Sequence, residues 1–74
     1  MKLPVLRPRQ VEQILKRAGY TADRQTGSHR IFVHPRKIPH VAVPVTNKDI
    51  KPGTLRGIIK QAEMTPEEFL RWRK

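Results

Sequence analysis

Two segments of the chain repeat the same helical spacing of apolar residues, and they enclose a stretch rich in β-forming residues. Their apolar positions follow i, i+3, i+4 and i+7, which is one face of an amphipathic helix. The first set is Val11, Ile14, Leu15 and Ala18, and the second is Leu55, Ile58, Ile59 and Ala62. We predict helices over about residues 8–18 and 52–62, with Pro8 in the first turn and Gly19 in the left-handed position after the end.

The stretch between these helices predicts an antiparallel meander of three strands. Residues 29–34 are rich in β-formers, and residues 40–45 place Val41, Val43 and Val45 on one face of a half-buried strand. Turn signals lie at residues 26–28 and 35–39. Residues 20–25 show no clear period, so the first strand is the least defined of the three.

A short third helix is predicted after the second. Thr65 is expected to cap it, with Pro66 at the first position and Glu68 completing a capping box. Phe69 and Trp72 are expected to pin it to the core. A chain of 74 residues has room for one small domain, because chains this short bury only about 60% of their unfolded surface. We therefore predict one α+β domain over residues 1–74, in the order α-β-β-β-α plus a short C-terminal helix, with a three-stranded antiparallel sheet covered by helices on one face.

The charge of the chain is strongly one-sided. It has 16 Lys and Arg against 6 Asp and Glu, a formal net charge of +10, which points to a polyanionic partner. Nucleic acid is the first candidate, followed by an anionic membrane and an acidic protein. The basic residues are dispersed rather than gathered on one amphipathic helix, which argues against the membrane. The chain has no cysteine and no apolar run as long as a signal-peptide core or a membrane span, so we expect a soluble cytoplasmic protein.

The machinery of conventional hydrolases is missing. The acidic residues are scattered, with no cluster suited to two-metal phosphate chemistry, and we expect no metal and no cofactor. His34 and His40 flank a turn, and we interpret them as polar strand-end residues rather than metal ligands. Ser28 directly precedes His29, so in a strand the two side chains would point to opposite faces. RNA cleavage needs fewer catalytic groups from the protein, because the 2′-hydroxyl of RNA is itself the nucleophile and a histidine can remove the proton of that hydroxyl.

Four segments carry a resemblance to a known family. They read GSHRIFVHP (27–35), VAVP (41–44), NKDIKPGTL (47–55) and IIKQA (58–62). Together they closely resemble the HicA-type toxins, the mRNA interferases of HicA/HicB toxin–antitoxin systems, over about residues 9–70. The resemblance implies a fold like the double-stranded-RNA-binding domain, which agrees with the order predicted above. It also implies a metal-independent endoribonuclease that cleaves messenger RNA and is neutralised by a HicB-type antitoxin. Any DNA binding by the toxin–antitoxin complex would come from the antitoxin.

The resemblance places the catalytic histidine at His29, presented by a turn of Gly27 and Ser28. Ile31 and Val33 share a strand face with His29. If that face belongs to the core, partial desolvation lowers the pKa of His29 and keeps part of it neutral at pH 7.

This chain departs from the family pattern at two positions. Thr46 stands where family members often have a second histidine, which leaves the complementary acid unassigned. Glu63 follows Ala62 where many members have glycine. Glutamate adopts the left-handed conformation poorly, so we expect a different turn into the third helix.

The candidate RNA-binding residues lie near the turn and at the second helix. They are Gly27, Ser28, Arg24, Arg30, Lys48, Lys51, Gly53 and Thr54. The arginines flank the turn and could stabilise transition-state charge, while the start of the second helix offers free N–H groups to a phosphate. The plain alternative for the two lysines is that they are solvated loop charges, and Phe32 is better interpreted as a core aromatic. The alternative for the whole chain is a non-catalytic RNA-binding module of the same fold.

Overall fold

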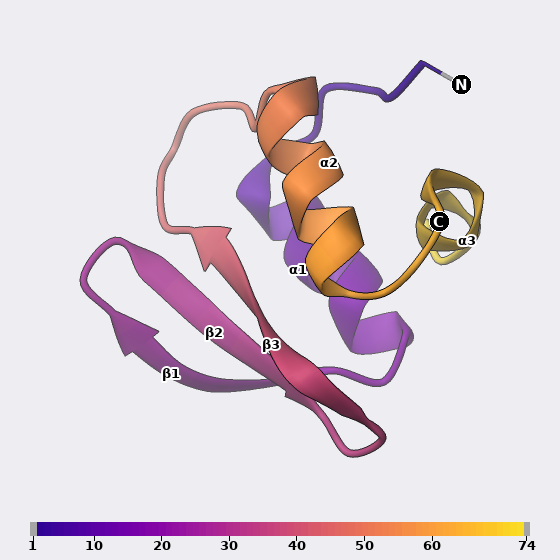
Figure 1. The fold of residues 1–74 in the computed structure, drawn as a ribbon. Coiled ribbons are helices and arrows are strands. Elements are labelled where there is room, and N and C mark those ends of the chain that lie inside the picture. Colours follow the sequence, from indigo (N-terminus) through magenta and orange to yellow (C-terminus); the bar gives the residue numbers. More distant parts are fainter. Residues whose placement is uncertain (1, 74) are drawn as a thin grey trace.

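A three-stranded sheet covered on one face by helices makes up residues 2–73, the part of the chain that the computed structural model describes (Figure 1). The elements are α1 (Pro8–Arg17), β1 (Thr21–Thr26), β2 (His29–His34), β3 (Lys37–Pro44), α2 (Pro52–Gln61) and α3 (Pro66–Arg71). This order and the antiparallel pairing β1-β2-β3 confirm the predicted α+β fold with its short C-terminal helix.

Helix α1 begins and ends where the sequence predicts. Pro8 occupies its first turn, and Val11, Ile14 and Leu15 are buried on one face. After the helix, Gly19 has a φ of +104°, and the N–H of Tyr20 donates to the carbonyl of Leu15 at 2.9 Å. This bond and the left-handed glycine form the Schellman arrangement, which satisfies the last carbonyls of the helix.

The two faces of the sheet have different environments. Phe32 on β2 and Val41 and Val43 on β3 are fully buried, and they face α1 and α2. The opposite face, which we call the outer face, carries Ile31 and Val33 and has no helix over it (Figure 1). The helices therefore cover one face of the sheet only, as predicted.

Strand β3 is longer at its start than predicted. It begins at Lys37, so the expected turn at 35–39 shrinks to two residues, and Pro39 lies within the strand. Proline is tolerated there because β3 is an edge strand, and the register shift between Phe32 and His34 absorbs the extra residues of β3. The expected burial of Val45 is wrong, since it lies beyond β3 and is 43% exposed.

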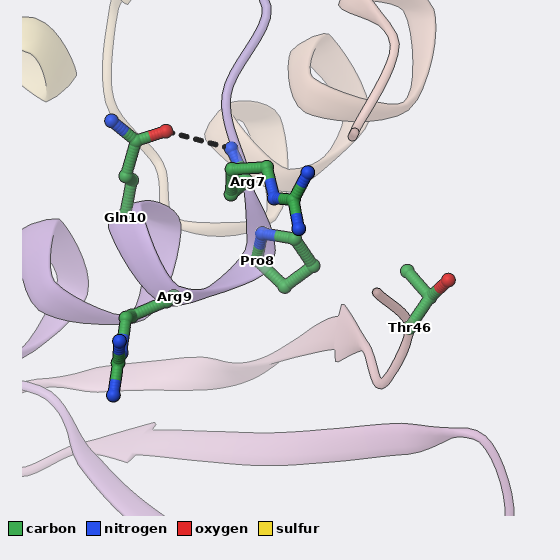
Figure 2. Close-up of a pocket in the computed structure, with 5 residues that line it drawn as sticks. All are labelled: Arg7, Pro8, Arg9, Gln10 and Thr46. Atoms are coloured by element: carbon green, nitrogen blue, oxygen red, sulfur yellow. Dashed lines mark hydrogen bonds between the residues drawn. The ribbon is translucent and has the colours of Figure 1, made fainter. Parts of the chain in front are cut away.

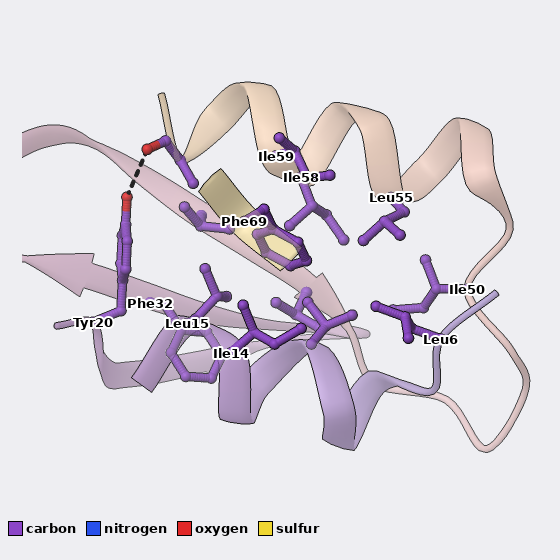
Figure 3. Close-up of a cluster of buried hydrophobic side chains, with 14 of the residues drawn as sticks. Leu6, Ile14, Leu15, Tyr20, Phe32, Ile50, Leu55, Ile58, Ile59 and Phe69 are labelled. Atoms are coloured by element: carbon purple, nitrogen blue, oxygen red, sulfur yellow. Dashed lines mark hydrogen bonds between the residues drawn. The ribbon is translucent and has the colours of Figure 1, made fainter. Parts of the chain in front are cut away.

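The core lies between the sheet and the two long helices, and Phe69 of α3 fills the space between α1 and α2 (Figure 3). The carbonyl of Ala62 accepts two hydrogen bonds, from the Tyr20 hydroxyl at 3.3 Å and from Lys37 Nζ at 2.7 Å. Burial raises the pKa of Tyr20 above its ordinary value, so its hydroxyl stays protonated and keeps donating up to alkaline pH.

The start of α3 is confirmed. Thr65 Oγ1 accepts from the Glu68 N–H at 3.1 Å, and Glu68 Oε1 accepts from the Thr65 N–H at 2.9 Å. The second bond holds the pKa of Glu68 below its ordinary value. Phe69 is fully buried, as expected. Trp72 is 43% exposed, so the expectation that it pins the helix to the core is wrong.

The turn that follows α2 keeps the glycine-type geometry without a glycine. Glu63 has a φ of +57°, and the N–H of Met64 donates to the carbonyl of Ile59 at 3.2 Å. This is again the Schellman arrangement, so the prediction of a different turn is wrong. Glu63 therefore adopts a left-handed backbone conformation, which costs roughly 1–2 kcal/mol in a residue with a Cβ.

We expect Glu63→Gly to stabilise the domain by about 0.5–1 kcal/mol. Glycine removes the cost of the left-handed conformation, but it also gives the unfolded chain more conformational freedom, which offsets part of the gain. Thermal unfolding followed by circular dichroism should show a melting temperature a few degrees higher. Glu67→Gly, in the first turn of α3, removes the same charge and should instead lower it. An unchanged or lower melting temperature in Glu63→Gly would show that the turn stores no strain.

Candidate functional site

The hairpin turn between β1 and β2 presents His29. Thr26 and His29 are paired across the strands, so Gly27 and Ser28 form a two-residue turn. Gly27 has a φ of +54° and Ser28 a negative φ, the pattern of a type II′ turn. The predicted turn is therefore present, and His29 is the first residue of β2.

His29 lies on the outer face of the sheet and is exposed. Ile31 and Val33 share this face and are half-buried. Phe32, which lies between them in the chain, points to the opposite face and into the core. The face of His29 is thus not the core face, and the partial desolvation expected for its ring is absent. His29 is freely reached from solvent.

The side chains of Ser28 and His29 touch, contrary to expectation. Ser28 Oγ lies 3.3 Å from His29 Nδ1, within hydrogen-bond distance. The expectation assumed that both residues belong to a strand, but Ser28 lies in the turn, where side chains do not alternate between faces. This contact occupies Nδ1, while Nε2 has no hydrogen-bond partner within residues 2–73. Nε2 is therefore the ring nitrogen that stays open to solvent.

The two arginines that flank the turn point in different directions. Arg24 is ion-paired with its neighbour Asp23 at the surface. Arg30 lies on the core-side face of β2 and reaches α1, where its guanidinium is 3.2 Å from Glu12 Oε1. Arg30 therefore does not lie beside His29, and the structure does not bring the two guanidinium groups together around it.

The end of β3 lies next to this turn. Pro44 is the cross-strand partner of His29, and the N–H of Val45 donates to the carbonyl of Ser28 at 2.6 Å. Thr46 follows at once, and its hydroxyl accepts from the N–H of Lys48 at 3.1 Å. Thr46, which replaces the second histidine of the family pattern, thus orders the loop that leads to α2.

The start of α2 is an open helix end with basic residues before it. Lys48, Lys51, Gly53 and Thr54 are all exposed, and Lys51 is the N-cap residue without a side-chain cap bond. The first turn contains no acidic residue. Free backbone N–H groups and the positive end of the helix dipole favour an anion here. These four predicted residues thus lie together in the exposed segment that runs from the loop before α2 into its first turn.

An open cleft of about 390 Å³ lies between the first turn of α1 and the loop after β3 (Figure 2). It is lined by Arg7, Pro8, Arg9, Gln10 and Thr46. Arg7 and Arg9 were not among the site residues predicted from the sequence. A signal was available, because basic residues at a helix start oppose the helix dipole and are unfavourable unless something offsets them.

The other two histidines do not form a site with each other. His34 packs edge-on against the Tyr20 ring, with centroids 4.9 Å apart, and its Nδ1 accepts from the Arg36 N–H at 3.0 Å. The strand register pairs His34 with Lys37 rather than with His40. Within residues 2–73, no group of three or more His, Cys, Asp or Glu side chains is placed to hold a metal ion. Nor does any helix in this range have the length and apolarity to cross a membrane.

Comparison with known proteins connects this hairpin and helix arrangement to one family. The family model described as the HicA toxin of bacterial toxin–antitoxin systems matches residues 8–64, which include α1, the sheet and α2. No curated protein matches the chain. The matched range contains His29, its turn and the loop before α2, and it leaves α3 and residues before Pro8 outside. The chain belongs to the HicA toxin family.

Proposed function

We propose that this toxin is a metal-independent endoribonuclease that cleaves messenger RNA in the cytoplasm, with His29 as the acid–base residue. The observation that carries the proposal is the His29 ring at the hairpin turn, exposed on the outer face, with Nδ1 beside Ser28 Oγ and Nε2 unoccupied by any residue from 2 to 73. A histidine with one nitrogen held and the other open is suited to proton transfer near neutral pH.

The reaction needs little from the protein, because RNA supplies the nucleophile. In the proposed step, neutral His29 takes the proton of a 2′-hydroxyl, and the 2′-oxygen forms a bond to the adjacent phosphorus. The bond from phosphorus to the 5′-oxygen of the next nucleotide breaks, that oxygen takes up a proton from water, and protonated His29 returns its proton to the solvent. The products are a 2′,3′-cyclic phosphate and a 5′-hydroxyl end. Arg24 is paired with Ile31, which shares the outer face with His29, so Arg24 is the predicted arginine on the same face and could offer charge stabilisation there.

Binding of the RNA backbone is assigned to the end of the molecule that carries the turn and the start of α2. We infer that Gly27 and Ser28 allow close approach of the strand to be cut. Lys48 and Lys51 supply positive charge, and the N–H groups of Gly53 and Thr54 bind a phosphate. The net charge of +10 supports such a surface, because phosphate contacts provide most of the affinity for nucleic acids. Arg30 is assigned instead to holding β2 against α1 through Glu12.

A toxin of a toxin–antitoxin family has an antitoxin as its partner. We propose that this partner is of the HicB type, that it covers His29, and that any DNA binding of the complex resides in the antitoxin. An enzyme that requires no metal and no cofactor can be silenced only by such physical blockage or by a change of its shape.

Cleavage in the presence of excess EDTA tests the proposed function. We expect the purified toxin to cut messenger RNA at the same rate with and without EDTA and to leave 2′,3′-cyclic phosphate ends. Loss of activity in EDTA, restored by a divalent ion, would contradict the metal-independent mechanism. Tight binding of RNA with no cleavage under any condition would favour the non-catalytic RNA-binding module.

A further inference from the structure

We propose that the N-terminal arm, residues 3–6, positions the loop of residues 46–51 for RNA binding, and that Leu6 is the positioning residue. The arm precedes residues 8–64, the range that matches the family model. This inference rests on the proposed function, which assigns Lys48 and Lys51 to the RNA backbone. It extends that function by naming the part of the chain that holds these two lysines in place.

The arm and the loop are joined through their backbones and their side chains. The N–H of Ile50 donates to the carbonyl of Leu6 at 2.7 Å, and the two residues form an isolated antiparallel bridge. Both side chains are buried, as is that of Leu3 at the start of the arm. Figure 3 shows Leu6 next to Ile50, at the end of the core where α2 begins. The arm is therefore anchored in the core.

The two bridged residues hold equivalent places before the two long helices. Leu6 precedes Arg7, the N-cap residue of α1, and Ile50 precedes Lys51, the N-cap residue of α2. An apolar residue at this place often packs against the fourth residue of the helix, an arrangement called the hydrophobic staple, which fixes how the chain enters the helix. The fourth residues of both helices are fully buried. The bridge therefore couples the entry into α2 to the entry into α1.

The loop has few other attachments to the domain. In the described part of the chain, the Ile50 N–H makes the one backbone hydrogen bond between residues 46–50 and another segment. Ile50 is also the buried residue of the loop, whose other members are exposed. The ion pair of Arg7 with Asp49, at 3.5 Å, is more than half exposed and is screened by water. A loop held by so few buried contacts opens easily once one of them is removed.

The arm thus lowers the cost of RNA binding without contacting the RNA. A lysine whose backbone is ordered before binding loses less conformational freedom when it contacts a phosphate. The number of phosphate contacts is the same with or without this ordering, so the salt dependence of binding is unchanged. Loss of a direct contact, in contrast, lowers both the affinity and its salt dependence.

Binding of a 2′-O-methyl RNA at several salt concentrations tests the arm. Leu6→Ala should raise Kd about tenfold at an unchanged salt slope, because the RNA must then order the loop and its two lysines. For cleavable RNA, KM should rise with Kd while kcat stays close to the wild-type value, since the hairpin turn holds His29. Hydrogen exchange of the Ile50 amide, followed by NMR without RNA, should become faster. Leu6→Met keeps the side-chain volume and should behave like the wild type.

Lys48→Gln/Lys51→Gln provides the comparison for a direct contact. It should lower the salt slope by about 1.4, which is roughly 0.7 for each lost phosphate contact on a single strand. Adding Leu6→Ala to it should cost little more, because the lysines that the arm positions are gone. If Leu6→Ala does not fold, Leu3→Ala at the start of the arm replaces it and should change Kd and Ile50 exchange in the same direction.

Leu70→Ala is the matched control, because it removes the same atoms from α3, which lies on the other side of α2 from the loop (Figure 1). It should bind RNA like the wild type and leave Ile50 exchange unchanged, at a temperature where thermal unfolding shows all variants folded. Equal Kd values in the arm variant and Leu70→Ala would overturn the positioning role alone, as would an arm variant that loses only antitoxin affinity. Failure of the wild type to cleave any RNA would overturn the proposed function, and the inference with it.

Discussion

His29→Ala should lower the rate of RNA cleavage by about 10²–10⁴, the range that loss of a general acid–base residue costs. Folding should be unaffected, because His29 is exposed and lies on the face of the sheet without helices. Affinity for a non-cleavable RNA should also remain nearly constant, since the proposed phosphate contacts come from other residues. The measurements are single-turnover cleavage, thermal unfolding and binding of a 2′-O-methyl RNA.

His40→Ala provides the matched control, because His40 is an exposed histidine on β3 with no assigned role. It should cleave RNA like the wild type. Wild-type cleavage by folded His29→Ala would refute the catalytic assignment. A further arm tests the contact at Nδ1: Ser28→Ala should reduce activity less than His29→Ala, because it frees the ring without removing it.

Expression of this chain alone should stop cell growth, and co-expression of its antitoxin should restore it. We expect the antitoxin to present an acidic surface to His29 and to the loop of residues 48–51, because the toxin carries a net charge of +10. Opposite charges of this size accelerate association, and the rate should fall steeply with added salt. Arg30 lies outside the expected contact, since its side chain is on the other face of β2.

Competition between RNA and antitoxin distinguishes blockage from a change of shape. His29→Ala toxin is immobilised so that the RNA is not consumed, and antitoxin is added at increasing concentration. We expect RNA to be displaced in proportion to antitoxin bound. Formation of a stable ternary complex of toxin, RNA and antitoxin would rule out blockage and point to an allosteric mechanism.

The sequence predicted the helices well and the first strand poorly, for a physical reason. Helices α1 and α2 bury one face each, so their apolar residues repeat with the helical period. All residues of β1 are exposed, and a bulge between Ala22 and Arg24 interrupts its alternation. A strand that buries nothing leaves no periodic signal, and only its pairing with β2 defines it.

Within the site, the sequence predicted what depends on local conformation. The turn of Gly27 and Ser28 and the position of His29 follow from neighbours in the chain. The cleft does not, because it joins Arg7 to Thr46, which are brought together by the packing of the whole domain. The direction of Arg30 was missed for a related reason: it depends on which face of β2 is buried, and Phe32 decides this by pointing to the helices.

The residues that we propose for the chemistry of this toxin all lie on its surface, since His29, Lys48 and Lys51 are exposed and are not part of the core. A mutation that abolishes cleavage therefore leaves a folded protein with most of its antitoxin-binding surface intact. In a cell that also makes the intact toxin, such an inactive copy would compete for the same antitoxin and, by mass action, release active toxin. Inactivating mutations would thus be dominant and harmful in the presence of an intact copy, and would persist only where they replace it.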